Sequence, residues 1–182
     1  HPTTADARHS LGVAILQRCK VTFEGSLGYF GCGLGDGAEF QVNGRVGWSV
    51  AENMMSGVVV IDKNSGSLTG AALRGGDVVV RGDVGARSGI DQKGGTIIVG
   101  GNAGMMTGFM LQRGRQVICG NVGGGLGDSM YDGAIYVGGS GGLTASARVA
   151  TTAASLRVGG PLQMRSSDAE VGRASCRERV CS

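Results

Sequence analysis

Glycine recurs in this chain at a fixed interval, and this regularity is the strongest constraint on what the chain can fold into. A second glycine column keeps the same 19-residue period and lapses only at Lys63. Repetition at a fixed period of this length is typical of a solenoid, in which each repeat stacks on the one before it. The unbroken column, which we interpret as structural, consists of Gly28, Gly47, Gly66, Gly85, Gly104, Gly123 and Gly142.

Each repeat also carries a short apolar triplet that favours a β-strand. The first and third residues of every triplet are apolar except at Gln116, so alternation with a period of two directs one side of each strand inward. No intervening segment has the helical pattern that the crossovers of an α/β sheet require. The triplets are VTF (21–23), FQV (40–42), VVI (59–61), VVV (78–80), IIV (97–99), QVI (116–118) and IYV (135–137).

The sequence therefore predicts an all-β fold, a single-stranded parallel β-helix of about six coils over residues 21–142, after an N-terminal lead-in or cap at residues 1–20. Val21, Phe40, Val59, Val78 and Ile97 are expected to form one internal ladder, with a second made of Leu27, Val46, Val84 and Val122. Asn or Asp beside glycine, as in GNAG (101–104) and GDVG (82–85), predicts turns that need a positive φ. The glycine columns themselves are expected to mark left-handed or tightly packed backbone.

The repeat is not continued after Gly142. We expect residues 143–182 to be an atypical tail, either disordered or translated out of frame, because the back-translation of Gly172–Val180 resembles a sequencing adapter. This tail holds six Arg against three acidic residues, whereas residues 1–142 hold eleven residues of each sign. The body therefore lacks the basic stripe of a nucleic-acid-binding protein. It has no apolar run long enough to span a membrane and nothing like a secretory signal, so we expect a soluble, cytoplasmic protein.

Catalytic motifs fail when their spacing is tested. Gly89–Gly94 begins like a phosphate-binding loop, but Gly95 stands where the lysine is needed and no helical pattern follows. Both histidines, His1 and His9, precede the repeats, so no Ser-His-Asp arrangement is expected within them. The five cysteines contain no CxxC pair and are expected to be reduced thiols. The sequence thus predicts no catalytic, cofactor-binding or metal-binding residues in this chain.

Two segments depart from the repeat pattern, namely VAENMMSG (50–57) and LGDSMYDG (126–133). The methionines gather in the half of the coil opposite the triplets, where they either fill the core or provide an adaptable contact surface. We predict partner contacts for Glu52, Asn53, Met54, Met55, Asp128, Ser129, Met130 and Tyr131.

Together, GVAILQRCKVTFEGSLGYF (12–30), VAENMMSGVVVI (50–61), the recurrent GxxGxxxG and LGDSMYDGAIYVGG (126–139) resemble the GXGXG domain family. This domain forms the C-terminal part of the glutamate synthase large subunit, and the most similar form is the stand-alone small subunit of N-methylglutamate synthase complexes. The resemblance covers about residues 11–142 and implies a right-handed β-helix.

The resemblance also implies a function. The chain would be a non-catalytic, structural subunit of a complex that makes glutamate or N-methylglutamate. Its partners would be a glutamine-amidotransferase-like subunit and an FMN-dependent glutamate-synthase-like subunit, which would carry the FMN and an iron–sulfur cluster. The alternatives are a protein like the related subunit of formylmethanofuran dehydrogenase, or a free-standing carbohydrate-binding or carbohydrate-cleaving β-helix. The last alternative requires a row of exposed aromatics or carboxylates, which the sequence columns do not suggest.

Overall fold

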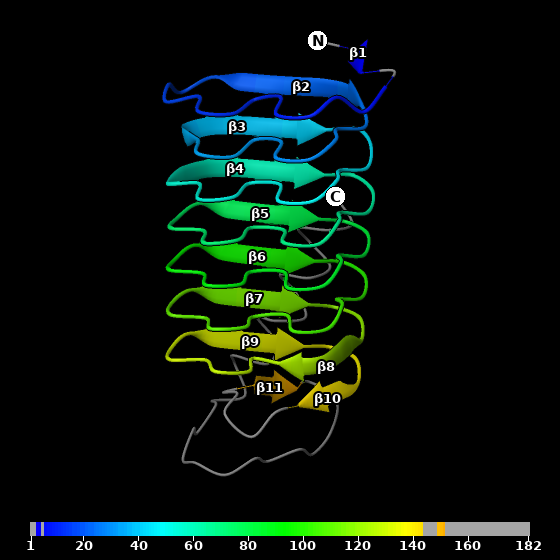
Figure 1. Cartoon of the computed structure of the whole chain (residues 1–182), viewed down its shortest axis with the longest axis vertical. Helices are drawn as coiled ribbons and strands as arrows, with labels where there is room; N and C mark the ends of the chain where they lie inside the picture. Colours follow the sequence, from blue (N-terminus) through cyan, green and yellow to red (C-terminus); the bar gives the residue numbers. More distant parts are fainter. Residues whose placement is uncertain (1–2, 5, 144–148, 152–182) are drawn as a thin grey trace.

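The computed structural model describes residues 3–4, 6–143 and 149–151. This part of the chain contains no helix and winds into a parallel β-solenoid of about six turns with a spacing of about 19 residues (Figure 1), which confirms the predicted fold class. Every predicted triplet lies within a strand. The seven strands are β2 (Lys20–Gly25), β3 (Asp36–Val42), β4 (Ser56–Ile61), β5 (Asp77–Val80), β6 (Thr96–Val99), β7 (Arg115–Ile118) and β9 (Ala134–Val137).

Each strand pairs in parallel with the strand of the next coil, in the register that the 19-residue period predicts. Val59 pairs with Val78, and Val78 pairs with Ile97. The sheet is extended at one end by β1 (Thr3–Thr4) and at the other by β11 (Val149–Thr151). Strand β8 (Val122–Leu126) pairs with β10 (Gly141–Leu143), which contains Gly142.

The stretch that the sequence assigns to an atypical tail is described only in part. Leu143 ends β10, and β11 pairs in parallel with β9 through contacts such as Val149 with Ile135. Residues 144–148 and 152–182, including the adapter-like end, lie outside the described residues.

The lead-in before residue 20 stacks on the first full coil through the backbone. The Ser10 amide donates to the Tyr29 carbonyl at 2.8 Å, and the Ala14 amide donates to the Gly33 carbonyl at 2.9 Å. In the other direction, the Cys32 amide donates to the Leu11 carbonyl at 2.8 Å. The polar backbone groups at this end of the repeat array are thereby hydrogen-bonded.

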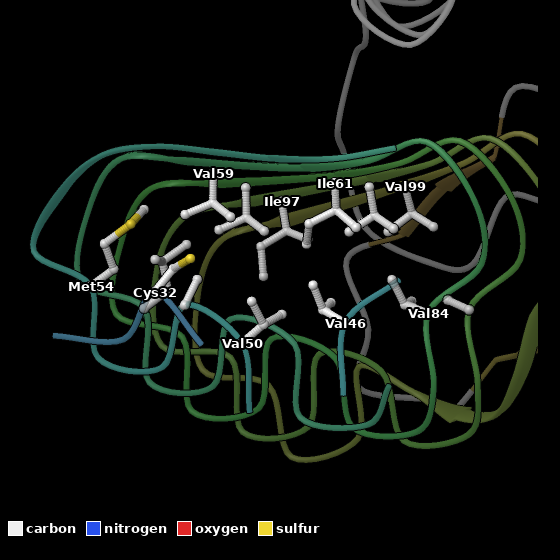
Figure 2. Close-up of a cluster of buried hydrophobic side chains, with 14 of the residues drawn as sticks. Cys32, Val46, Val50, Met54, Val59, Ile61, Val84, Ile97 and Val99 are labelled. Atoms are coloured by element: carbon white, nitrogen blue, oxygen red, sulfur yellow. The ribbon is translucent and has the colours of Figure 1, made fainter. Parts of the chain in front are cut away.

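The core is a narrow apolar layer inside the coils (Figure 2), where Val59, Ile61, Ile97 and Val99 point inward from the sheet. The predicted first ladder is buried, apart from the partly buried Val21 at its end. The second ladder is also buried and is completed by two small residues at the same phase. Its members bridge in parallel in the order Leu27, Val46, Ser65, Val84, Ala103 and Val122.

Opposite the sheet, each coil passes through three left-handed residues at alternate positions. In the first full coil these are Phe30, Cys32 and Leu34, with φ between 56° and 58°. The same three positions are left-handed in later coils, although non-glycine residues usually avoid this conformation. The backbone on this side is therefore corrugated, and we call its outer surface the corrugated face.

The unbroken glycine column is explained by close approach between coils and not by a positive φ. None of its described members is left-handed. A Cβ atom on Gly66 would lie 2.8 Å from the carbonyl carbon of Gly47, and one on Gly85 would lie 2.8 Å from that of Gly66. Each glycine thus lies directly on its equivalent in the preceding coil, where no side chain fits.

The expectation that Asn and Asp beside glycine mark positive-φ turns is wrong for the GNAG and GDVG segments. Asp83, Asn102 and Asn121 have ordinary backbone and instead form a ladder along the solenoid. The Asn102 amide donates to Asp83 Oδ1 at 2.7 Å, and the Asn121 amide donates to Asn102 Oδ1 at 2.8 Å. These side chains satisfy backbone groups that the neighbouring coil leaves unpaired at this corner.

Replacing one rung of this ladder is expected to weaken the contact between two coils. In Asn102→Ala, the Asn121 amide loses its side-chain acceptor, and the lost hydrogen bond is expected to lower the free energy of unfolding by about 1 kcal/mol. Chemical denaturation of the two proteins measures this difference. A matched change at the exposed Lys63, which occupies a neighbouring corner position, should leave stability unchanged.

Candidate partner-docking face

The two segments predicted to contact a partner occupy the same phase of the repeat. Glu52–Met55 and Asp128–Tyr131 lie 76 residues apart, which is four periods of 19. The backbone links the intervening coils at this phase, since the Asn53 amide donates to the Ala71 carbonyl and the Met110 amide to the Asp128 carbonyl. At about 4.8 Å per coil, the two segments are about 19 Å apart along one side of the solenoid.

Within each segment, neighbouring residues point in opposite directions. Met54 is fully buried and points into the core (Figure 2), while Met55 is 50% exposed. Met130, at the same phase as Met54, packs against the core, while Tyr131 is 72% exposed. Met54 is therefore a core residue, and its assignment to the contact surface is wrong. Among the other assigned residues, Ser129 is exposed, and Glu52, Asn53 and Asp128 are partly exposed.

The corrugated face extends this surface across the coils and is mostly apolar. Phe30 and Trp48 are about half exposed, and Met105 is 60% exposed. The charged groups among its outward positions are few, chiefly Glu52, Arg87, Asp91 and Asp128. The apolar residues at exposed or partly exposed outward positions are Tyr29, Phe30, Leu34, Trp48, Leu68, Ile90, Met105, Met106, Phe109 and Met110.

The aromatic members of this face form a stack along the solenoid axis. Tyr29 and Trp48 lie one period apart with ring centroids 5.3 Å apart, and His9 stacks on Tyr29 at 4.6 Å. A row of exposed aromatics therefore exists, contrary to what the sequence columns suggested. Tyr29 lies between His9 and Trp48 in this stack, so its ring faces contact protein and its edge faces solvent. This arrangement does not provide a free ring face for a sugar.

The titratable groups of the described residues are held by the fold. His9 Nδ1 accepts a hydrogen bond from the Tyr29 amide at 2.8 Å. Cys119 is disulfide-bonded, so the expectation of reduced thiols is wrong for this residue, whereas Cys19 and Cys32 are free. Within the described ranges, no group of three or more His, Cys, Asp or Glu side chains is arranged to hold a metal ion. Nor does this part of the chain form a helix able to cross a membrane.

Burial raises the pKa of the Cys32 thiol from 9.0 to about 12. The folded state therefore keeps its proton at a pH where the unfolded chain has lost it, and this contribution to stability declines as pH rises from 9.0 to about 12. In Cys32→Ala, which copies Ala51 at the same phase, the free energy of unfolding should fall less steeply over this range. Denaturation at a series of pH values tests the prediction. Equal slopes for the two proteins would contradict it.

The fold and the apolar face define a class of protein, a parallel β-solenoid with one broad side suited to contact with another protein. Over 53 residues the chain is 47% identical to Protein GlxC of Rhizobium meliloti (strain 1021), a match covering 29% of this chain and 23% of that protein. The chain thus aligns with about a quarter of the length of this curated relative. No family model and no solved structure matches. The partial similarity supports a distant relation to glutamate-synthase-related subunits.

Proposed function

We propose that this chain is a non-catalytic assembly subunit of a cytoplasmic glutamate-synthase-type complex that makes glutamate or N-methylglutamate. The observation that carries the proposal is the apolar corrugated face, with Trp48 and Met105 more than half exposed. A contiguous exposed surface of this kind is typical of a protein interface. The partial similarity to Protein GlxC supports the relation to this class of complex.

The composition of the corrugated face suits a protein partner. Interfaces are enriched in aromatic residues and methionine and depleted of charge at their centre, and this face has all three properties. Methionine side chains such as Met105 and Met106 adapt their shape to an opposing surface. The stacked Tyr29 and Trp48 provide rigid apolar area, which is the usual chemistry of an interface residue with a large energetic contribution.

In this proposal the chemistry belongs to the partners. A glutamine-amidotransferase-like subunit would release the amino group, and an FMN-dependent glutamate-synthase-like subunit with an iron–sulfur cluster would form the product. The solenoid would hold the two in a fixed relation. Stacked coils suit that role because adjacent coils are joined by parallel strand pairing throughout β2 to β9 and together form a rigid rod.

Co-expression with the flavoprotein and amidotransferase encoded beside this chain tests the proposal. Tagged wild-type chain should retain a stoichiometric flavoprotein through affinity and size-exclusion steps. Met105→Glu introduces a charge at the centre of the face and should weaken retention about 30-fold or more, because burying an unpaired charge costs at least about 2 kcal/mol. Lys63→Glu, at an exposed corner away from the face, is the matched control and should bind normally.

Two outcomes would contradict the proposal. A folded wild-type chain that never associates with the flavoprotein would remove its basis. Association with a molybdenum or tungsten protein would instead assign the chain to the formylmethanofuran dehydrogenase type.

A further inference from the structure

The interior of the solenoid changes from apolar to polar along its length. The inward ladder of aliphatic side chains is interrupted at Gln116, which lies between Ile97 and Ile135 at the same phase. Gln92 also points inward, at the phase of Leu73 and Leu111. Buried polar side chains are rare without a partner, so the hydrogen bonds of this group need a full account. The buried polar residues of these coils are Ser65, Thr69, Ser88, Gln92, Thr107 and Gln116.

The two glutamines form a buried amide pair that satisfies all but one of its oxygen atoms. Gln116 Nε2 donates to Gln92 Oε1 at 3.0 Å. Gln92 Nε2 in turn donates to the carbonyls of Gly94 at 2.9 Å and Gly95 at 3.1 Å. Gln116 Oε1 is buried and has no hydrogen-bond partner among the described residues. Leaving such an oxygen unpaired carries a desolvation penalty, which a bound donor would remove.

The residues beside this oxygen leave room for a small polar molecule. The Gln116 side chain extends across the interior to Gly89, where no side chain competes for space. Ser88, which precedes Gly89, is the smallest residue at its inward position, where other coils have Val50 and Leu126. Ser88 Oγ donates to the Thr69 carbonyl at 3.4 Å, the outer limit of a hydrogen bond, so the hydroxyl oxygen still has capacity to accept.

We propose that the interior holds a buried water molecule between Gln116 and Ser88. The water donates one hydrogen bond to Gln116 Oε1 and the other to Ser88 Oγ, which gives it the two protein partners that a stable internal water needs. The Gln92–Gln116 pair and this water then form one satisfied polar network. The inference is independent of any partner protein, because both residues are fully enclosed by the coils.

A high-resolution crystal structure of the wild-type chain tests the site directly. The expected result is a well-ordered density peak within hydrogen-bond distance of both Gln116 Oε1 and Ser88 Oγ. The proposal is overturned if no peak is present there. It is equally overturned if the amide of Gln116 is turned so that Oε1 accepts from a protein donor.

Stability measurements provide a second test with a matched pair. Ser88→Ala keeps the space for water and should change the unfolding equilibrium constant less than Ser88→Val, which fills that space and leaves Gln116 Oε1 unpaired. We expect the valine variant to be at least tenfold less stable than the alanine variant. In the apolar background Gln92→Leu/Gln116→Ile, which copies neighbouring coils, this penalty should disappear. An equal penalty in both backgrounds would contradict the proposal.

Discussion

Replacing Gly85 with alanine is expected to lower the free energy of unfolding by more than about 3 kcal/mol, one of the largest effects of a single methyl group in this chain. The added Cβ would lie 2.6 Å from the Ser67 amide nitrogen and 2.8 Å from the carbonyl carbon of Gly66. Both atoms belong to the backbone of the preceding coil, so neither can rotate away. The coils must separate at this point, and the parallel pairing on both sides weakens. Chemical denaturation monitored by circular dichroism measures the loss.

Gly124→Ala is the matched control for this experiment. Gly124 also lies opposite the sheet and has an ordinary φ, but an added Cβ would have no neighbour within 4 Å. Its substitution should change the free energy of unfolding by less than about 0.5 kcal/mol. If Gly85→Ala proves as stable as Gly124→Ala, the explanation of the glycine column by contact between coils is wrong.

The second large effect concerns glycines that face long side chains across the interior. Gly70 is left-handed, and an added Cβ would lie 2.7 Å from Ile97 Cδ1. The equivalent position one coil earlier is Ala51, also left-handed, and the residue 27 positions after it is Val78 instead of isoleucine. The left-handed backbone therefore tolerates alanine, and the length of the opposing side chain determines whether glycine is needed.

Gly70→Ala is accordingly expected to cost about 2 to 3 kcal/mol through overpacking. Adding Ile97→Val removes the Cδ1 atom and recreates the Ala51–Val78 pair, so the double variant should recover to within about 1 kcal/mol of wild type. Denaturation of both single variants and the double variant gives the coupling. Additive effects would show that the two side chains do not share this space.

The repeat made most of this fold predictable because stacked coils place every residue beside its equivalent 19 positions away. The strand triplets, the parallel register of Val59 with Val78 and the inward ladders all follow from that one relation. The shared phase of Glu52–Met55 and Asp128–Tyr131 follows in the same way, since four periods separate them. Their position on one side of the solenoid could therefore have been predicted from the 19-residue period.

Other features depend on backbone detail that the period does not carry. The alternate left-handed residues reverse the usual relation between spacing and direction, so Met54 turns inward while Met55 turns outward. The turn preference of Asp83 and Asn102 suggested positive-φ backbone, but their side chains bond to the next coil. Tyr29 and Trp48 share a phase in the sequence, yet their stacking depends on ring orientation.

Methionine oxidation measured by mass spectrometry, with the chain free and in complex with the flavoprotein, tests the central claim most directly. Met105 is 60% exposed and Met55 is 50% exposed, while the buried Met54 is an internal standard. If the corrugated face binds the partner, Met105 should oxidise readily in the free chain and be protected in the complex, with Met54 slow in both. Oxidation of Met105 at the same rate in the free chain and in a stable complex would contradict the account.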